Sequence, residues 1–129
     1  IMGDEMIQGI GIDLCDITRI EKALKHKGFK ERVFSEEEIE YAESKAMPAR
    51  HFAASFAAKE AMAKATGWGI IGLGLNSLYV RRTKNGPKFI FSEETAEKLY
   101  KFNISNVLLS ISHEGDMAVA MVVLEKRNA

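Results

Sequence analysis

Residues 8–14, QGIGIDL, are the stretch from which the fold can be worked out. Aliphatic residues alternate there with a second set that is small or acidic, namely Gly9, Gly11 and Asp13. Successive side chains of a β-strand point to opposite faces, so this period-two alternation predicts a strand. One of its faces is almost bare and ends in a carboxylate. Another backbone can therefore come close to that face, beside Asp13.

Three helices are predicted after this strand. The first begins at a capping box, residues 18–21 (TRIE), and ends near Gly28. A second capping box, residues 35–38 (SEEE), opens a short helix. The third starts at Pro48, runs through an alanine-rich segment and stops at Gly67, which makes it the long central helix.

The second half of the chain is predicted to be richer in strands. Strands 75–82 and 88–91 join at the turn Asn85-Gly86, residues 92–102 are helical, and strands 107–112 and 117–124 form a hairpin. The order is β, three helices, ββ, α, ββ. This pattern predicts an α+β domain in which a mainly antiparallel sheet packs with the long central helix and the shorter helices.

The composition excludes several classes of protein. The chain has 129 residues, and its 18 Lys+Arg balance 18 Asp+Glu, which argues against a globally basic nucleic-acid binder. No uncharged stretch reaches the roughly 18 residues of a membrane span, and residues 1–6 show no secretory signal. The single cysteine, Cys15, allows no internal disulfide and is typical of a reducing, cytoplasmic setting.

The charge is unevenly distributed along the chain. Residues 19–32 contain six basic and two acidic side chains, whereas residues 35–44 contain five glutamates and no Lys or Arg. Both segments can be ordinary solvated helix faces. Alternatively, the first helix offers a positive ridge to an acidic partner, because a local potential steers association even at zero net charge.

Two apparent motifs do not fit their usual chemistry. Residues 67–72, GWGIIG, match G-x-G-x-x-G, but here the glycines close a helix and precede a strand, the reverse of a dinucleotide site. They form either a plain helix cap or a loop whose amides approach a phosphate. Ser112 and His113 are neighbours on a predicted strand and point apart, which excludes a hydrolase pair. Three histidines and one cysteine supply a zinc site poorly.

The central helix carries the most informative group of side chains. Glu60 and Lys64 are four residues apart and adjacent on one helix face. They are either a surface ion pair or part of a site, because the surrounding alanines let another element come close. If that element is the strand ending at Asp13, two carboxylates can hold Mg²⁺ and the lysine can neutralise a phosphate.

These segments resemble motifs of the 4′-phosphopantetheinyl transferases. Residues 11–13 (GID) are similar to the G-x-D motif, and residues 56–64 (FAAKEAMAK) to the (F/W)-x-x-K-E-x-x-x-K motif. Residues 16–21 (DITRIE), 64–69 (KATGWG) and 110–113 (SISH), with the Asn-Gly turn, resemble the short bacterial type, the holo-acyl-carrier-protein synthases. The resemblance spans residues 6 to 124.

The resemblance implies a fold, a reaction and an assembly. It implies an α+β homotrimer with active sites at the subunit interfaces, and no nucleic-acid or membrane partner. The reaction would transfer 4′-phosphopantetheine from coenzyme A to a serine of apo acyl carrier protein, with Mg²⁺, releasing adenosine 3′,5′-bisphosphate. Residues 6–125 would be the transferase domain, residues 1–5 an extension or artificial remnant, and residues 126–129 a tail.

The resemblance also assigns roles to individual residues. Asp13 and Glu60 would hold the metal and, with Lys64, carry the catalysis; Glu60 could also help to remove the serine proton. Coenzyme A would be bound by Lys59, Lys64, Gly67, Gly69, Asn85, Gly86 and His113. The carrier protein would meet Arg19, Lys22 and Lys25.

Two positions depart from the family pattern. Ser55 stands where the family commonly has an arginine that contacts a coenzyme A phosphate, and Arg50 or His51, one turn earlier, is the candidate replacement. The turn at Asn85-Gly86-Pro87 lacks the residue that members often place between Gly and Pro. A non-catalytic trimeric module that binds a nucleotide or an acidic partner is the alternative function. A phosphate-ester hydrolase is disfavoured because no nucleophile is evident.

Overall fold

Two antiparallel sheets and six helices make up the part of the chain that the computed structural model describes, residues 5–127. Their order is β1 (Glu5–Asp16), α1 (Ile17–Ala23), α2 (Phe29–Val33), α3 (Glu36–Glu43), α4 (Pro48–Thr66), α5 (Gly69–Leu73), β2 (Leu78–Thr83), β3 (Gly86–Phe91), α6 (Glu93–Lys101), β4 (Ile104–Glu114) and β5 (Met117–Arg127). The predicted α+β class is confirmed. No helix within residues 5–127 is both long and apolar enough to cross a membrane.

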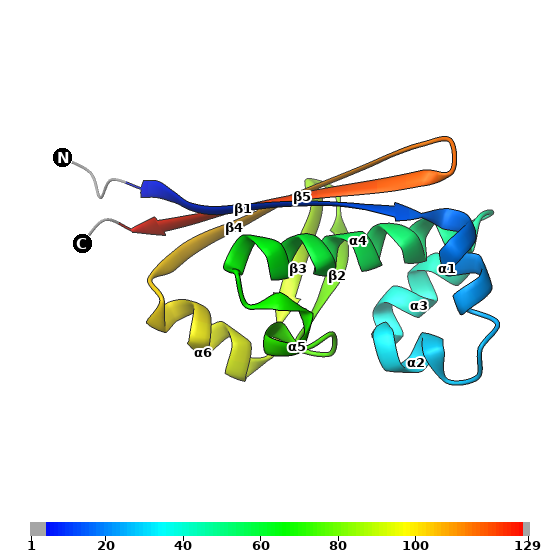
Figure 1. Ribbon diagram of the computed structural model, residues 1–129, viewed down its shortest axis with the longest axis horizontal. Coiled ribbons are helices and arrows are strands. Elements are labelled where there is room, and N and C mark those ends of the chain that lie inside the picture. The colour runs from blue at the N-terminus through cyan, green and yellow to red at the C-terminus, as the bar shows by residue number, and fades with distance from the viewer. Residues whose placement is uncertain (1–4, 128–129) are drawn as a thin grey trace.

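Helix α4 lies along one face of the larger sheet and forms the core with it (Figure 1). The strand order in this sheet is β1-β5-β4, so β5 is central, whereas β2 and β3 form a separate two-stranded sheet. Small buried side chains of α4 face the buried alternate residues of β5, which are Ala118, Ala120, Val122 and Leu124. The alanine-rich composition of α4 thus lets helix and sheet pack closely.

The bare face of β1 is in direct backbone contact with α4. A Cβ atom added to Gly9 would collide with the carbonyl oxygen of Ala65, and one added to Gly11 with the carbonyl oxygen of Ala61. Only glycine allows a strand and a helix to approach this closely. The predicted approach of the two elements beside Asp13 is therefore confirmed.

The helix ends were predicted correctly except at α1. Ser35 and Glu38 form the predicted capping box of α3, and α4 begins at Pro48 and is closed by Gly67 in the left-handed conformation. At α1, however, the N-cap is Asp16, whose Oδ1 accepts hydrogen bonds from Thr18 N at 2.9 Å and Thr18 Oγ1 at 2.7 Å. The capping box predicted at residues 18–21 is wrong, because the carboxylate of Asp16 satisfies the first turn two residues earlier.

Several boundaries also differ from the prediction. Helix α1 ends at Ala23, not near Gly28 as predicted, and two five-residue helices, α2 and α5, add to the three predicted between the first two strands. Strand β5 continues through Arg127, so the first two residues of the predicted tail pair with β1 instead. Of the predicted N-terminal extension, residues 1–4 lie outside the described residues and Glu5 already belongs to β1.

We expect Gly11→Ala to lower the free energy of unfolding by about 3 kcal/mol, because the new methyl group can fit only if β1 and α4 separate. Urea denaturation measures this change. The matched control is Gly72→Ala in α5, where the nearest atom to the added Cβ is the Trp68 Cβ at 3.3 Å. That change should stay within about 1 kcal/mol. Equal effects at the two positions would contradict the close approach as the cause.

Candidate active site

Strand β1 and helix α4 bring Asp13 and Lys64 together. The ammonium group of Lys64 donates to Asp13 Oδ1 at 2.9 Å and to the backbone oxygen of Ile12 at 3.0 Å. The Asp13 side chain is 17% exposed and that of Lys64 is 56% exposed. The strand face that carries Asp13 thus meets the helix face that carries Lys64, as the sequence predicted.

Glu60 lies one turn before Lys64 and is the second carboxylate of the group. Burial raises its pKa above the usual carboxyl range, and the charge of Asp13 raises it further, while Lys64 and Arg19 oppose this effect. Within residues 5–127, the Glu60 side chain forms neither a hydrogen bond nor an ion pair. Two carboxylates that repel each other in a half-buried site favour a bound cation or a proton.

The glycine loop borders the same carboxylate and lysine. Gly67 and Gly69 line an open groove of about 290 Å³ with Glu60, Lys64, Ala63 and Ile70. Both glycines have positive φ, 75° and 73°, and Gly69 begins the short helix α5. The backbone here can approach a ligand that contacts Glu60 and Lys64 at the same time.

A second, strongly basic cluster surrounds Tyr41 of α3. Lys45 Nζ lies 4.7 Å and Arg82 Cζ 4.9 Å from the centre of the Tyr41 ring, and the His51 ring packs on it edge-on at 5.4 Å. Burial lowers the pKa of His51, and the positive charges around it lower it further; these charges belong to Arg82, Lys45, Arg50 and His113.

Two arginine atoms of this basic cluster are buried and unpartnered. Neither Nε of Arg50 nor Nη2 of Arg82 has a hydrogen-bond partner among the described residues. Buried polar groups without partners are rare in proteins, and here they belong to side chains that carry positive charge. An anionic ligand would supply the missing acceptors.

Sequence reasoning identified only part of the basic cluster. It singled out His113, Arg50 and His51 but missed Lys45 and Arg82. These two residues come from the segment before α4 and from β2, so no local spacing links them. The strand order of the sheet also separates the basic cluster from the site beside Glu60. Asp13 belongs to β1 and His113 to β4, and these strands are the opposite edges of the sheet.

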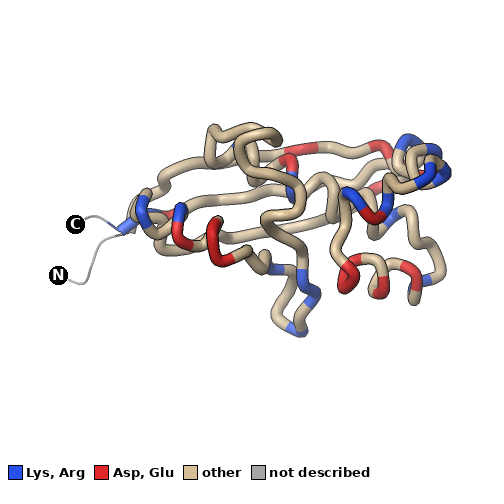
Figure 2. Tube along the Cα trace, turned by 90° about the horizontal axis from the view of Figure 1, so that it is seen from below, with Lys and Arg blue, Asp and Glu red and all other residues tan. Residues whose placement is uncertain are grey.

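The predicted ligand residues Asn85 and Gly86 lie away from the groove beside Glu60. They form the turn of the β2–β3 hairpin, which projects from the body of the protein and carries basic residues (Figure 2). Neither residue lines that groove. Their role in binding coenzyme A therefore remains a prediction.

The structure buries Lys59, which was predicted to contact phosphate, and does not place it at the groove beside Glu60. Its side chain is 1% exposed, and its ammonium group donates to Val33 O at 2.7 Å, Glu38 Oε1 at 2.9 Å and Leu75 O at 3.3 Å. Five residues separate Lys59 from Lys64, which turns the two side chains about 140° apart around the helix. This spacing places the two lysines on different faces of α4.

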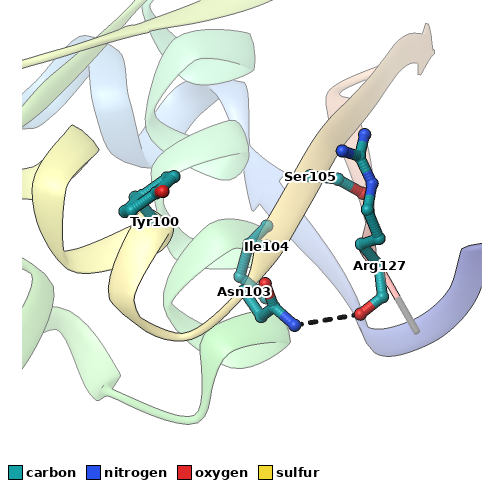
Figure 3. Close-up of a pocket in the computed structure, with 5 residues that line it drawn as sticks. All are labelled: Tyr100, Asn103, Ile104, Ser105 and Arg127. Atoms are coloured by element: carbon teal, nitrogen blue, oxygen red, sulfur yellow. Dashed lines mark hydrogen bonds between the residues drawn. The ribbon is translucent and has the colours of Figure 1, made fainter. Parts of the chain in front are cut away.

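A further pocket, of about 260 Å³, lies between the end of α6 and the end of β5 (Figure 3). It is lined by Tyr100, Asn103, Ile104, Ser105 and Arg127. No carboxylate or histidine is among these residues, and Asn103 Nδ2 is bound to the backbone oxygen of Arg127 at 3.0 Å. This pocket lacks the groups needed for acid–base or metal chemistry.

Comparison with known proteins identifies the class to which this fold and site belong. A family model described as the 4′-phosphopantetheinyl transferase superfamily matches residues 9–122. This range includes Asp13, Glu60, Lys64 and the whole basic cluster. The chain belongs to the 4′-phosphopantetheinyl transferase superfamily.

Individual relatives within this class match almost the entire chain. A holo-[acyl-carrier-protein] synthase of Syntrophus aciditrophicus is 44% identical over 124 residues, covering 93% of this chain and 97% of the relative. The crystal structure of the Neisseria meningitidis synthase has a TM-score of 0.86 at 35% identity, covering 94% of this chain and 100% of that one. The Helicobacter pylori synthase, solved in complex with coenzyme A, has a TM-score of 0.77 at 36% identity and covers 89% of this chain and 98% of that one.

We expect Lys59→Met to lower the free energy of unfolding by about 3–5 kcal/mol, because it leaves the buried carboxylate of Glu38 without its counter-ion. The matched control is Lys64→Met on the same helix, which removes an ion pair whose lysine is 56% exposed and should cost much less, about 1 kcal/mol. Chemical denaturation measures both changes. If Lys59→Met kept full stability but lost affinity for coenzyme A, Lys59 would be a ligand residue after all.

Proposed function

We propose that this protein transfers the 4′-phosphopantetheine group from coenzyme A to a serine of an apo acyl carrier protein. The observation that carries the proposal is the meeting of Asp13 and Lys64 beside Glu60 and the glycine loop, in a chain of this superfamily. In the reaction the serine oxygen forms a new ester bond to the phosphorus attached to pantetheine. The pyrophosphate bond of coenzyme A breaks, and adenosine 3′,5′-bisphosphate leaves.

The donor atoms of the site fit a magnesium ion. Asp13 and Glu60 offer hard oxygen ligands, and the Glu60 side chain has no partner among the described residues. Burial, and after it the charge of Asp13, raises the pKa of Glu60, and a cation between the two carboxylates would offset both effects. Two carboxylates together with substrate phosphates are a usual way to hold Mg²⁺. A bound Mg²⁺ would neutralise charge on the pyrophosphate.

The other groups around this position have separate roles in the proposed reaction. Lys64 is placed to stabilise negative charge as it develops on the leaving phosphate, which is the main form of catalysis in phosphoryl transfer. Glu60 is the candidate base for the serine proton, because its carboxylate forms no side-chain hydrogen bond or ion pair within residues 5–127. The backbone of Gly67 and Gly69 can approach the phosphates from the other side of the groove.

The basic cluster is the candidate site for the 3′-phosphate of coenzyme A. Ser55 cannot take this role because it is buried in α4, at 5% exposure. Arg50 and His51 lie at the start of the same helix, and the unpartnered Nε of Arg50 and Nη2 of Arg82 are donors that a phosphate would satisfy. These contacts would replace the arginine that the family commonly has at position 55.

A homotrimer with shared active sites would explain why the site beside Asp13 and the basic cluster lie on opposite edges of the sheet in one chain. A coenzyme A molecule that meets Asp13 of one chain could meet the basic cluster of the next. The sheet face turned away from α4 also carries exposed aliphatic side chains, and these are Ile10, Ile12 and Leu14 on β1 and Leu108 on β4, each between 50% and 62% exposed. Such a surface is typical of a protein interface.

The basic end of the molecule is the candidate docking surface for the acidic carrier protein. We define the basic ridge as Arg19, Lys22 and Lys25, in and just after α1, where Figure 2 shows a dense group of basic residues. The charge of Arg19 reaches Glu60 and opposes the rise in its pKa. The ridge therefore adjoins the site at which a serine of the partner would have to arrive.

Transfer should be lost in Asp13→Asn and Glu60→Gln, each by at least about a hundredfold, because charge stabilisation by a metal ion is worth several kcal/mol of the barrier. The measurement is mass spectrometry of apo carrier protein after incubation with coenzyme A and Mg²⁺. Wild-type protein should add the mass of one phosphopantetheine group.

The same assay distinguishes the enzyme from a binding module. A module would bind coenzyme A but leave the carrier mass unchanged. Light scattering on the assayed sample should give the mass of a trimer, and circular dichroism should show that both variants are folded. Full transfer by the Asp13→Asn, Glu60→Gln double variant, or by wild type in excess chelator, would contradict the mechanism.

Charge reversal in the basic ridge should weaken binding of the carrier protein. We expect Arg19→Glu with Lys22→Glu to raise the KM for the carrier about tenfold or more at low salt, with the KM for coenzyme A unchanged, because surface charges act on association and are screened by salt. The control is Lys98→Glu with Lys101→Glu in α6, which makes the same change in net charge. Equal effects of the two double variants would show that the ridge is only a solvated helix face.

A further inference from the structure

We propose that Lys64 is the resident counter-ion of the metal site, and that a divalent cation must displace it from Asp13. The ammonium group would neutralise Asp13 while the site holds no metal. Its displacement would then free Lys64 to contact the substrate phosphates. This inference rests on the proposed function, which assigns Asp13 to the metal and Lys64 to the phosphates.

The contacts of Lys64 show that it occupies a cation site on β1. Its Nζ is held by two oxygens, Asp13 Oδ1 at 2.9 Å and Ile12 O at 3.0 Å. Both acceptors come from adjacent residues of one strand. A carboxylate oxygen and a backbone carbonyl oxygen are also ligands that hard metal ions take. The ammonium group and a metal ion would therefore seek the same electron pairs.

The burial of the two partners makes exchange possible. Asp13 is 17% exposed, so most of its surface is removed from water and its charge needs a partner. Lys64 is 56% exposed, so its flexible side chain can move its ammonium group into solvent at small cost. The carboxylate thus stays in place, and the cation beside it can be exchanged.

Two cations cannot share this oxygen. An ammonium group at hydrogen-bond distance from Asp13 Oδ1 would lie within a few ångströms of a metal ion on the same oxygen and would be repelled by it. Glu60 attracts Lys64 through its charge but forms no ion pair with it among the described residues, so Asp13 is the carboxylate that holds the ammonium group. Metal binding should therefore break the Lys64–Asp13 contact.

Removal of the counter-ion should strengthen metal binding. We expect Lys64→Met to bind Mn²⁺ roughly three- to tenfold more tightly than wild type, measured by calorimetry and electron paramagnetic resonance on the free protein without coenzyme A. The matched control is Arg19→Met, which removes a positive charge that acts on Glu60 without a hydrogen bond to either carboxylate among the described residues. We expect a change below about twofold there.

A double-mutant cycle locates the competition at Asp13. In an Asp13→Asn background, Lys64→Met should no longer tighten Mn²⁺ binding, because the contact that it removes is already lost. The proposal is overturned if Lys64→Met leaves Mn²⁺ affinity unchanged or weaker, if Arg19→Met has an equal effect, or if neither wild type nor Lys64→Met binds Mn²⁺ up to millimolar concentration. These outcomes are distinguishable from failure of the proposed function, which the transfer assay reports on wild-type protein alone.

Discussion

The backbone contact between β1 and α4 is the constraint on which the rest of the structure depends. Gly9 and Gly11 present no side chain to the helix, and the carbonyl oxygens of Ala61 and Ala65 fill the space that a Cβ would need. The contact sets the distance between the strand that carries Asp13 and the helix that carries Glu60 and Lys64. Glycine and alanine thus position charged groups that are far apart in the sequence.

The buried ion pair of Lys59 and Glu38 also positions charged groups, on the other side of α4. Glu38 Oε1 accepts from Lys59 at 2.9 Å and from the backbone of Ser35 at 2.9 Å, while Oε2 accepts from the backbone of Val80 at 2.7 Å. One carboxylate therefore joins α3, α4 and β2. These three elements carry Tyr41, His51 and Arg82, so the pair holds the frame of the basic cluster. A buried charge with this many partners specifies one arrangement of its neighbours.

Local patterns predicted most of the fold and the meeting of Asp13 with Lys64. The alternation in β1, the alanines of α4 and the Ser35 capping box each have a short-range cause, so they were visible in the sequence. The N-cap of α1 was missed because Asp16 and Thr18 are both residue types that favour the N-cap position. The sequence alone does not show that Asp16 takes it. Lys59 was assigned to the ligand through its motif, although its place on the helix faces inward. The basic cluster could not be predicted as a unit, because α3, β2 and β4 meet only in three dimensions.

The two faces of β1 also limit how this protein can evolve. From Gly9 to Leu14, each odd-numbered residue faces α4 or the carboxylate site, and each even-numbered residue is an exposed aliphatic side chain on the other face. A substitution at an odd position meets backbone or removes a charge. At an even position it alters the exposed apolar surface of the sheet. Almost no substitution in residues 9–14 would therefore be neutral. Most sequence change in this protein should occur in exposed segments that do not contact β1.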